Sequence, residues 1–225
     1  MACSHGNLEA VKIIVEDWGV DVSTAAVHSI GGLVAVDVRM TPLFLAGYNR
    51  HNKIVRYLTA KGAQLSSSTT LAVRTPPEHL RWNCGATPLH AAVRNSSIFS
   101  NHEGRVSTIR ILLECGADPS ALTQDDIPVW STLYRDGIEI TTLLVQWGLD
   151  LSQRCPKTGI TLLHLWAGNR GYGNKDEILG VVKMILEKGA DPQARDNNGL
   201  SVILMAAIGD CHFLNLLVMD YLLER

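Results

Sequence analysis

Residues 84–95, CGATPLHAAVRN, bring together a cysteine, a threonine and a histidine, three residue types that are common in active sites. For His90 to act as a general base, a nucleophile and a group that orients the imidazole must lie nearby. No G-x-S-x-G, H-E-x-x-H or cysteine–histidine signature occurs in the chain. The segment TLLHL at residues 161–165 places His164 in an equivalent position. We therefore interpret both histidines as structural and expect that the chain is not an enzyme.

Cysteine usage argues against a disulfide framework and against a metal site. The five cysteines are scattered, odd in number and never in a C-x-x-C pair: Cys3, Cys84, Cys115, Cys155 and Cys211. Reduced packing thiols are typical of proteins inside the cell. We expect no metal, no cofactor, and an intracellular location in the cytoplasm or nucleus.

The segment GNRGYGNK has the spacing of a phosphate-binding loop in part only. Gly168 and Gly173 are five residues apart, but Asn174 separates the second glycine from Lys175. A helix, rather than a strand, is expected before the segment, so the context of a phosphate loop is missing. No small-molecule substrate is evident, and a flexible turn is the simpler interpretation.

The pattern around His90 recurs along the chain. TPLHAA at residues 87–92 matches the T-P-L-H-x-A signature, TPLFLA at 41–46 is a second copy, and TLLHL at 161–165 is a third. Apolar segments that end in glycine follow, such as RILLECGAD and KMILEKGAD. The chain resembles the ankyrin-repeat family over nearly its whole length. The resemblance implies an all-α solenoid of helix-turn-helix units in which the histidine fastens adjacent loops. The residues expected to be structural are Thr41, Thr87, His90, Thr161 and His164.

The residue pattern by itself also predicts stacked helical units, independently of the resemblance. The segment VSTIRILLECGAD has an apolar surface too broad for a helix with one solvated face, so it must be covered on two sides. Gly116 suits a left-handed helix cap, and Asp118-Pro119 prevents continuation of the helix. Threonine before proline suits a helix N-terminus. A single unit of this kind cannot bury its own core, so neighbouring units must stack.

Insertions interrupt the repeat. Three of the four intervals between the helix-ending glycines exceed the family period of about 33 residues. We expect one ankyrin-repeat domain over residues 1–225, with units near 1–22, 38–65, 84–121, 124–152, 157–192 and 196–225 and insertions at 23–37, 66–83, 96–105 and 169–176. The abrupt start and the uncapped end indicate a fragment of a longer protein.

The structure of two of the insertions, and the effect of one unusual residue, can be predicted from the sequence. Two β-prone runs joined by Gly31-Gly32 predict a β-hairpin near residues 26–37. The serines, threonines and prolines of residues 66–83 predict an irregular loop. Trp166 stands where the family has a small alanine, so either its helix is displaced or the register is off by one residue.

Composition limits the partners. The net charge is −2 and 46% of the residues are hydrophobic, which argues against nucleic acid as the main partner. No run of about 18 apolar residues is present that would span a membrane. A protein or peptide is the partner that this composition and the resemblance favour.

The family's concave groove, formed by loop tips and first helices, is the expected binding surface. Carried over position by position, it contains tyrosine, arginine and aspartate, which make good interface anchors. The expected groove residues are Arg39, Tyr48, Asn49, Arg94, Asn95, Asp125, Asp126, Tyr134 and Arg135, and further loop-tip positions are Met40, Lys157 and Thr158.

The sequence therefore predicts an intracellular adaptor-type module that binds a protein or peptide. An early hairpin insertion between repeats, over about the first 65 residues, is similar to the Fem-type substrate receptors of ubiquitin ligases. That similarity implies recognition of a C-terminal degron as an alternative. An enzyme that uses the inserted loops and a purely structural spacer are the remaining alternatives.

Overall fold

A computed structural model describes residues 2–30, 36–66, 69–71, 85–94, 102–133, 137–168, 175–208 and 214–224. The chain divides into two compact units, Met1–Thr132 and Leu133–Arg225, and each is described by itself. The expected insertions at 66–83, 96–105 and 169–176 lie largely outside the described residues.

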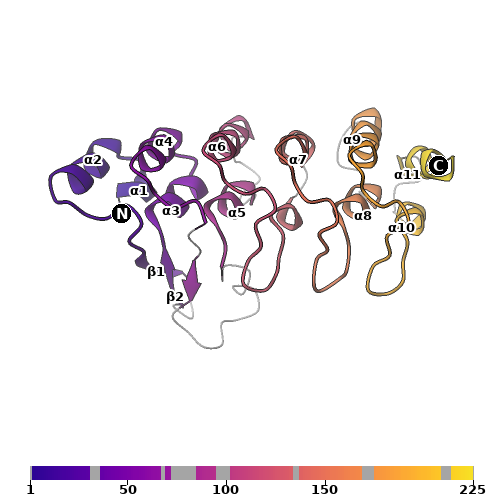
Figure 1. Ribbon diagram of the computed structural model, residues 1–225, viewed down its shortest axis with the longest axis horizontal. Helices are drawn as coiled ribbons and strands as arrows, with labels where there is room; N and C mark the ends of the chain where they lie inside the picture. The colour runs from indigo at the N-terminus through magenta and orange to yellow at the C-terminus, as the bar shows by residue number, and fades with distance from the viewer. Residues whose placement is uncertain are drawn as a thin grey trace. The chain divides into compact units, whose positions relative to one another are not determined.

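Met1–Thr132 is built from helix pairs. Their helices are α1 (Ala2–His5), α2 (Leu8–Glu16), α3 (Pro42–Tyr48), α4 (Asn52–Ala60), α5 (Pro88–Val93) and α6 (His102–Glu114). In Figure 1, α4 and α6 lie side by side in one row and α3 and α5 in the other. This arrangement confirms the all-α stack of helix-turn-helix units, because each helix is covered by its own partner and by the next pair.

Local capping explains where the first helices begin. The hydroxyl of Thr41 accepts a hydrogen bond from the Phe44 N–H at 3.2 Å, and Pro42 occupies the first helical position. Thr87 plays the same part before α5, with Pro88 following it. The short polar side chain satisfies one of the free N–H groups at a helix start.

The fourth pair departs from the helix-turn-helix pattern. Where a first helix is expected after Pro128, the chain forms only the 3-10 helix η2 (Val129–Thr132). Trp130 is fully buried there, and Val129 is buried beside it. A short helical turn thus contributes its apolar residues to the core without completing a first helix.

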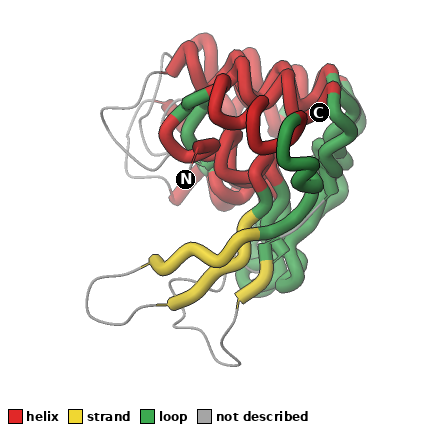
Figure 2. The backbone as a smooth tube through the Cα atoms, turned by 90° about the vertical axis from the view of Figure 1, so that its left-hand side faces the viewer, coloured by secondary structure: helices red, strands yellow, loops and turns green. Residues whose placement is uncertain are grey.

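The hairpin predicted near residues 26–37 is present, and its second strand continues to Met40. Strands β1 (Ala26–Ile30) and β2 (Val36–Met40) pair antiparallel, from Ala26 opposite Met40 to Ile30 opposite Val36. Strand β3 (Thr70–Leu71) adds to β2, giving the order β1-β2-β3. The prediction of a wholly irregular loop over 66–83 is therefore wrong at these two residues. Figure 2 shows the strands extending away from the helices.

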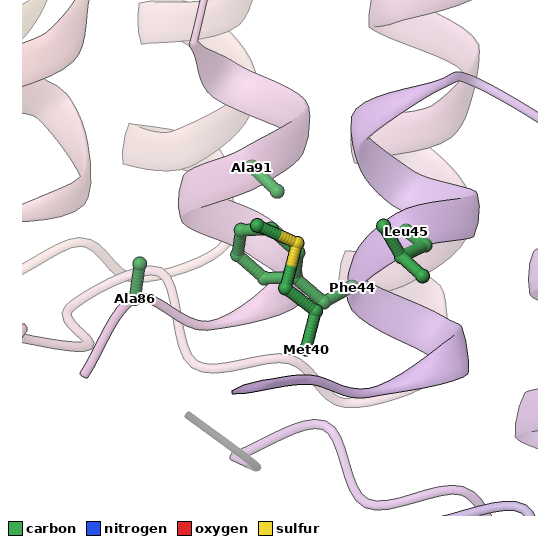
Figure 3. Packing of buried hydrophobic residues seen from close by; sticks show 5 residues of the cluster. All are labelled: Met40, Phe44, Leu45, Ala86 and Ala91. Atoms are coloured by element: carbon green, nitrogen blue, oxygen red, sulfur yellow. The ribbon is translucent and has the colours of Figure 1, made fainter. Parts of the chain in front are cut away.

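The end of β2 contributes to the core rather than to the surface. Met40 is 7% exposed and packs with Phe44, Leu45, Ala86 and Ala91 (Figure 3). The expectation that Met40 is an exposed loop-tip residue is wrong. Successive residues of a strand point to opposite sides, so an exposed Arg39 requires that Met40 turn toward α3.

Leu133–Arg225 repeats the helix-pair arrangement. Its helices are α7 (Gly137–Gln146), α8 (Leu162–Ala167), α9 (Lys175–Glu187), α10 (Val202–Ile208) and α11 (Leu214–Leu223). Helix α8 contacts α9 and α10, and α7 contacts α9. No helix among the residues with described structure is long and apolar enough to cross a membrane.

Trp166 is accommodated by its neighbours in α7. Its indole N–H donates to the Thr141 hydroxyl at 3.1 Å, and the side chain is 5% exposed. A Cβ added to Gly137 would lie 3.4 Å from the Trp166 ring. Thr161 caps α8 as Thr87 caps α5, so the register of the repeat holds and the large ring occupies the space beside Gly137.

Candidate partner-binding surface

Tyr48 and Arg94 are brought together at the ends of α3 and α5. Tyr48 is the last residue of α3, and Arg94 follows the last residue of α5. The two helices approach closely at Gly47, where an added Cβ would lie 3.2 Å from the Pro88 carbonyl oxygen. Tyr48 lies near enough to Arg94 to raise the pKa of its guanidinium, against the effect of burial. The sequence predicts only that Tyr48 and Arg94 occupy equivalent positions in two repeats. In the structure the two residues lie close together.

Burial sets the electrostatics of this group. The Tyr48 side chain is 36% exposed and Arg94 is half-buried. Burial lowers the pKa of Arg94 from its ordinary value, and the neighbouring Tyr48 opposes the shift. Partial desolvation strengthens the interaction of a guanidinium with a carbonyl or carboxylate oxygen, because less water competes for its donors. The group is suited to bind a polar atom of a partner beside an aromatic face.

Arg50 is a third member that the sequence patterns miss. It lies in the turn after α3 with a positive φ of 61°, and burial lowers its pKa while Tyr48 opposes the shift. A positive φ is unusual for a residue other than glycine. The sequence signal for this residue is the Asn49-Arg50 pair between two predicted helices, because asparagine is common in turns and so indicates that Arg50 lies in one.

Four other predicted groove residues have described positions in Met1–Thr132. Arg39 is exposed in β2, and Asp125 and Asp126 are exposed in the loop before η2. Asn49 is exposed, but its side-chain amide donates to the Leu45 carbonyl at 2.9 Å and so closes the end of its own helix. Asn95, Tyr134 and Arg135 lie outside the described residues.

His90 holds the loop that carries the two aspartates. Its Nδ1 accepts from the Thr87 N–H at 3.2 Å, and its Nε2 lies 3.2 Å from the Ile127 carbonyl oxygen. Because Nδ1 is an acceptor, the proton of the neutral ring belongs on Nε2, which then donates to Ile127. Burial lowers the pKa of His90 to about 4, so the ring stays neutral near pH 7. His90 therefore links the start of α5 to the loop that precedes η2.

His164 makes the same set of contacts in Leu133–Arg225. Its Nδ1 accepts from the Thr161 N–H at 3.2 Å, and its Nε2 lies 3.2 Å from the Leu200 carbonyl oxygen. Burial lowers the pKa of His164 as well. In both repeats the threonine hydroxyl lies 2.9 Å from Nδ1, so the pair is occupied by helix capping.

The cysteines with described positions lie apart from any group of three potential metal ligands. Cys3, Cys115 and Cys155 are free thiols, while Cys84 and Cys211 lie outside the described residues. Over the ranges that the structure describes, no three histidine, cysteine or acidic side chains come together to hold a metal ion.

Comparison with known families agrees with this geometry. A family model described as Ankyrin repeats (3 copies) matches residues 1–123, and one described as Ankyrin repeat matches residues 158–197. No curated protein matches the chain. Ankyrin repeats are generally protein–protein interaction modules. Because the first model alone covers more than half of the 225 residues, the chain belongs to the ankyrin-repeat family.

Proposed function

We propose that this chain binds a peptide or protein partner through the surface formed by Tyr48, Arg50 and Arg94, here called the Tyr–Arg surface. The observation that carries the proposal is the close approach of α3 and α5 at Gly47, which brings Tyr48 and Arg94 of two successive repeats near enough to interact. Tyrosine and arginine are enriched among residues that dominate binding energy, because they bury large area and keep a polar end. The other predicted groove residues that are described in Met1–Thr132, Arg39, Asn49, Asp125 and Asp126, are proposed to belong to the same binding surface.

The location that suits this function is the cytoplasm or the nucleus. Three free thiols, at Cys3, Cys115 and Cys155, support a reducing compartment. A binding module needs no cofactor, and the threonine–histidine pairs are occupied in capping helices and fastening loops.

The test is an affinity measurement with a partner first identified by purification from the native cell. Tyr48→Ala with Arg94→Ala removes both anchors and should weaken binding by well over 1 kcal/mol. The matched control is Arg56→Ala with Tyr57→Ala, which removes the same residue types from α4 of the same repeat. If the control pair weakens binding as much as the test pair, the loss is not specific to the Tyr–Arg surface.

The inserted loops are the competing binding site. Deleting residues 97–101 shortens the insertion before α6, which begins at His102. Unchanged affinity in the Tyr48 and Arg94 double variant, together with lost affinity in the deletion, would transfer the site to the insertion.

A further inference from the structure

Two arginines occupy the same position in successive loops of Leu133–Arg225. The residue after each arginine closes its loop with a backbone hydrogen bond: Cys155 N–H donates to Ile160 at 2.8 Å, and Asp196 N–H donates to Leu200 at 2.9 Å. Arg154 and Arg195 are therefore equivalent by structure. Figure 1 shows the two loops extending on the same side of the helices of this unit.

The two loops are joined by hydrogen bonds from side chains of one loop to backbone carbonyls of the other. The Arg154 guanidinium donates to the Arg195 carbonyl, and the Arg195 guanidinium donates to the Gly199 carbonyl at 2.9 Å. The side-chain amide of Asn197 donates to the Pro156 carbonyl at 3.2 Å. Each guanidinium has five N–H donors, these bonds use only part of them, and both arginines are exposed.

Among the residues that the structure describes, no carboxylate forms an ion pair with these three cations. Arg154, Lys157 and Arg195 are exposed, and the ion pairs Lys12–Glu9, Arg56–Glu114 and Lys61–Glu16 all involve other residues. The nearest carboxylate in sequence, Asp196, is 9% exposed and accepts from the N–H groups of Asn198 and Leu200, both at 2.8 Å. It is turned into its own loop, so the outer end of the two loops carries positive charge.

A loop of the same kind in the other unit carries the opposite charge. In Met1–Thr132 the corresponding loop is closed by Thr123 N–H donating to Ile127 at 3.1 Å. The position equivalent to Arg154 and Arg195 is Leu122 there, and the tip carries the exposed Asp125 and Asp126. The same loop geometry thus presents cations in one unit and anions in the other.

We propose that Arg154, Lys157 and Arg195, the basic tip, bind an acidic segment of a protein partner through its aspartate or glutamate side chains. Two guanidinium groups held in neighbouring loops suit paired carboxylates, because each can bind one carboxylate with two parallel hydrogen bonds. A nucleic acid is a poorer fit, since the chain carries a net charge of −2 and the tip has three cations. This inference rests on the proposed function in one respect, that the partner is a protein.

The experiment measures binding of the full chain to a fluorescently labelled oligoglutamate peptide by anisotropy at low and at physiological salt. Arg154→Gln, Lys157→Gln and Arg195→Gln are combined, because glutamine keeps a hydrogen-bond donor. We expect this variant to lose at least about tenfold in affinity. The matched control is Lys53→Gln, Arg56→Gln and Arg110→Gln, which removes one lysine and two arginines, all exposed, from α4 and α6. The control should lose about twofold or less.

Other outcomes overturn the proposal. Equal losses of affinity in the two triple variants would contradict it, as would the absence of oligoglutamate binding by the unaltered chain at low salt. A single-stranded oligonucleotide that binds more tightly and displaces the peptide would also contradict it. Self-association through the acidic loop of a second copy, seen as a concentration-dependent mass that the basic-tip variant abolishes, also contradicts it. If the triple variant does not fold, Lys157→Glu alone tests the same tip, because Lys157 is exposed at the loop end; it should weaken binding about threefold or more.

The two proposals can fail separately because they use different residues. Loss of partner binding in the Tyr48 and Arg94 variant, with no effect of the basic-tip variant on partner or peptide, contradicts only the basic tip. Binding of oligoglutamate at the basic tip, with no effect of the Tyr48 and Arg94 variant on the partner, contradicts only the Tyr–Arg surface.

Discussion

A single imidazole joins two repeats wherever the TPLH-type segment is complete. In His90 and His164 one ring nitrogen accepts from the helix that carries it, and the other donates to a carbonyl 37 or 36 residues further along the chain. A neutral histidine ring can do both, because one ring nitrogen accepts while the other donates. The residue type that first suggests catalysis is therefore explained by its two hydrogen bonds.

Replacing His90 with alanine should destabilise the protein. The change leaves the Thr87 N–H without its acceptor and removes one of the two donors to the Ile127 carbonyl, at a residue that is 3% exposed. We expect the free energy of unfolding in urea to fall by about 1–3 kcal/mol. His5→Ala, at an exposed position in α1, is the control and should change stability by less than about 0.5 kcal/mol. Equal stability of the two variants would show that the His90 hydrogen bonds add nothing.

Acid should destabilise the fold through the same ring. Burial lowers the pKa of His90 to about 4, below the value of 6.5 for a free histidine. The unfolded chain thus takes up a proton near pH 6.5 that the folded chain takes up only near pH 4. The free energy of unfolding is unaffected above about pH 6.5 and decreases as the pH falls toward 4, by on the order of 3 kcal/mol.

Urea denaturation at a series of pH values measures this decrease. In His90→Gln the decrease between pH 6.5 and 4 should be smaller, and His164, whose pKa burial also lowers, supplies part of what remains. A variant with the same pH dependence as the unaltered protein would contradict the assignment to His90.

At the scale of elements, neighbouring loops stack because glycine leaves room between them. Gly159 has a φ of 71°, and an added Cβ would lie 2.5 Å from the Asn197 backbone nitrogen. Gly85 has a φ of 76° and meets Gln124 of the next loop in the same way. Each glycine permits both a left-handed backbone and a close approach of the following repeat.

The two effects can be separated with Gly159→Ala and Gly189→Ala. Gly189 also has a positive φ, 96°, but a Cβ there meets nothing within 4 Å. Gly189→Ala should therefore cost only the backbone strain, about 1 kcal/mol. Gly159→Ala should cost about 1–3 kcal/mol more, because the Cβ collides with backbone atoms of the next loop. Similar losses in thermal or urea denaturation would show that the loops separate freely.

The hairpin is tied to the core at one end by Met40. Met40→Ala should cost about 2–4 kcal/mol, as large-to-small changes in a core do. Its neighbour Arg39 is exposed, and Arg39→Ala should change the free energy of unfolding by less than about 0.5 kcal/mol. Urea denaturation of both variants measures the difference, and equal losses would contradict the burial of Met40.

For the whole molecule, local signals predict the elements well because each has its own cause. Thr41-Pro42 and Thr87-Pro88 start helices, Gly116 ends one, and Gly31-Gly32 separates two strands that pair. The stacking of helix pairs follows from apolar surfaces too broad for one neighbour. None of these predictions requires knowledge of contacts distant in sequence.

The contacts between elements were harder to predict, since they depend on spacing that no local pattern specifies. Arg94 reaches Tyr48 because α3 and α5 approach at Gly47, and a match of repeat positions gives no such distance. The loop-tip position of the family places Met40 at the surface, but Met40 lies in a strand, where neighbouring residues alternate between the two sides, and it is buried. The links between Arg154 and Arg195 depend on how closely two loops stack.

The two compact units offer a test of how far a local defect spreads. In a repeat array each unit contacts only its neighbours, so stability is close to a sum of local terms. We expect His90→Ala to speed amide hydrogen exchange in Met1–Thr132, first at Thr123, whose N–H closes the loop that His90 holds. Gly159→Ala should speed exchange in Leu133–Arg225 instead. Mass spectrometry of peptides from the intact chain gives both patterns. If each variant speeds exchange equally in both ranges, the two units unfold as one, and the local description of stability is wrong.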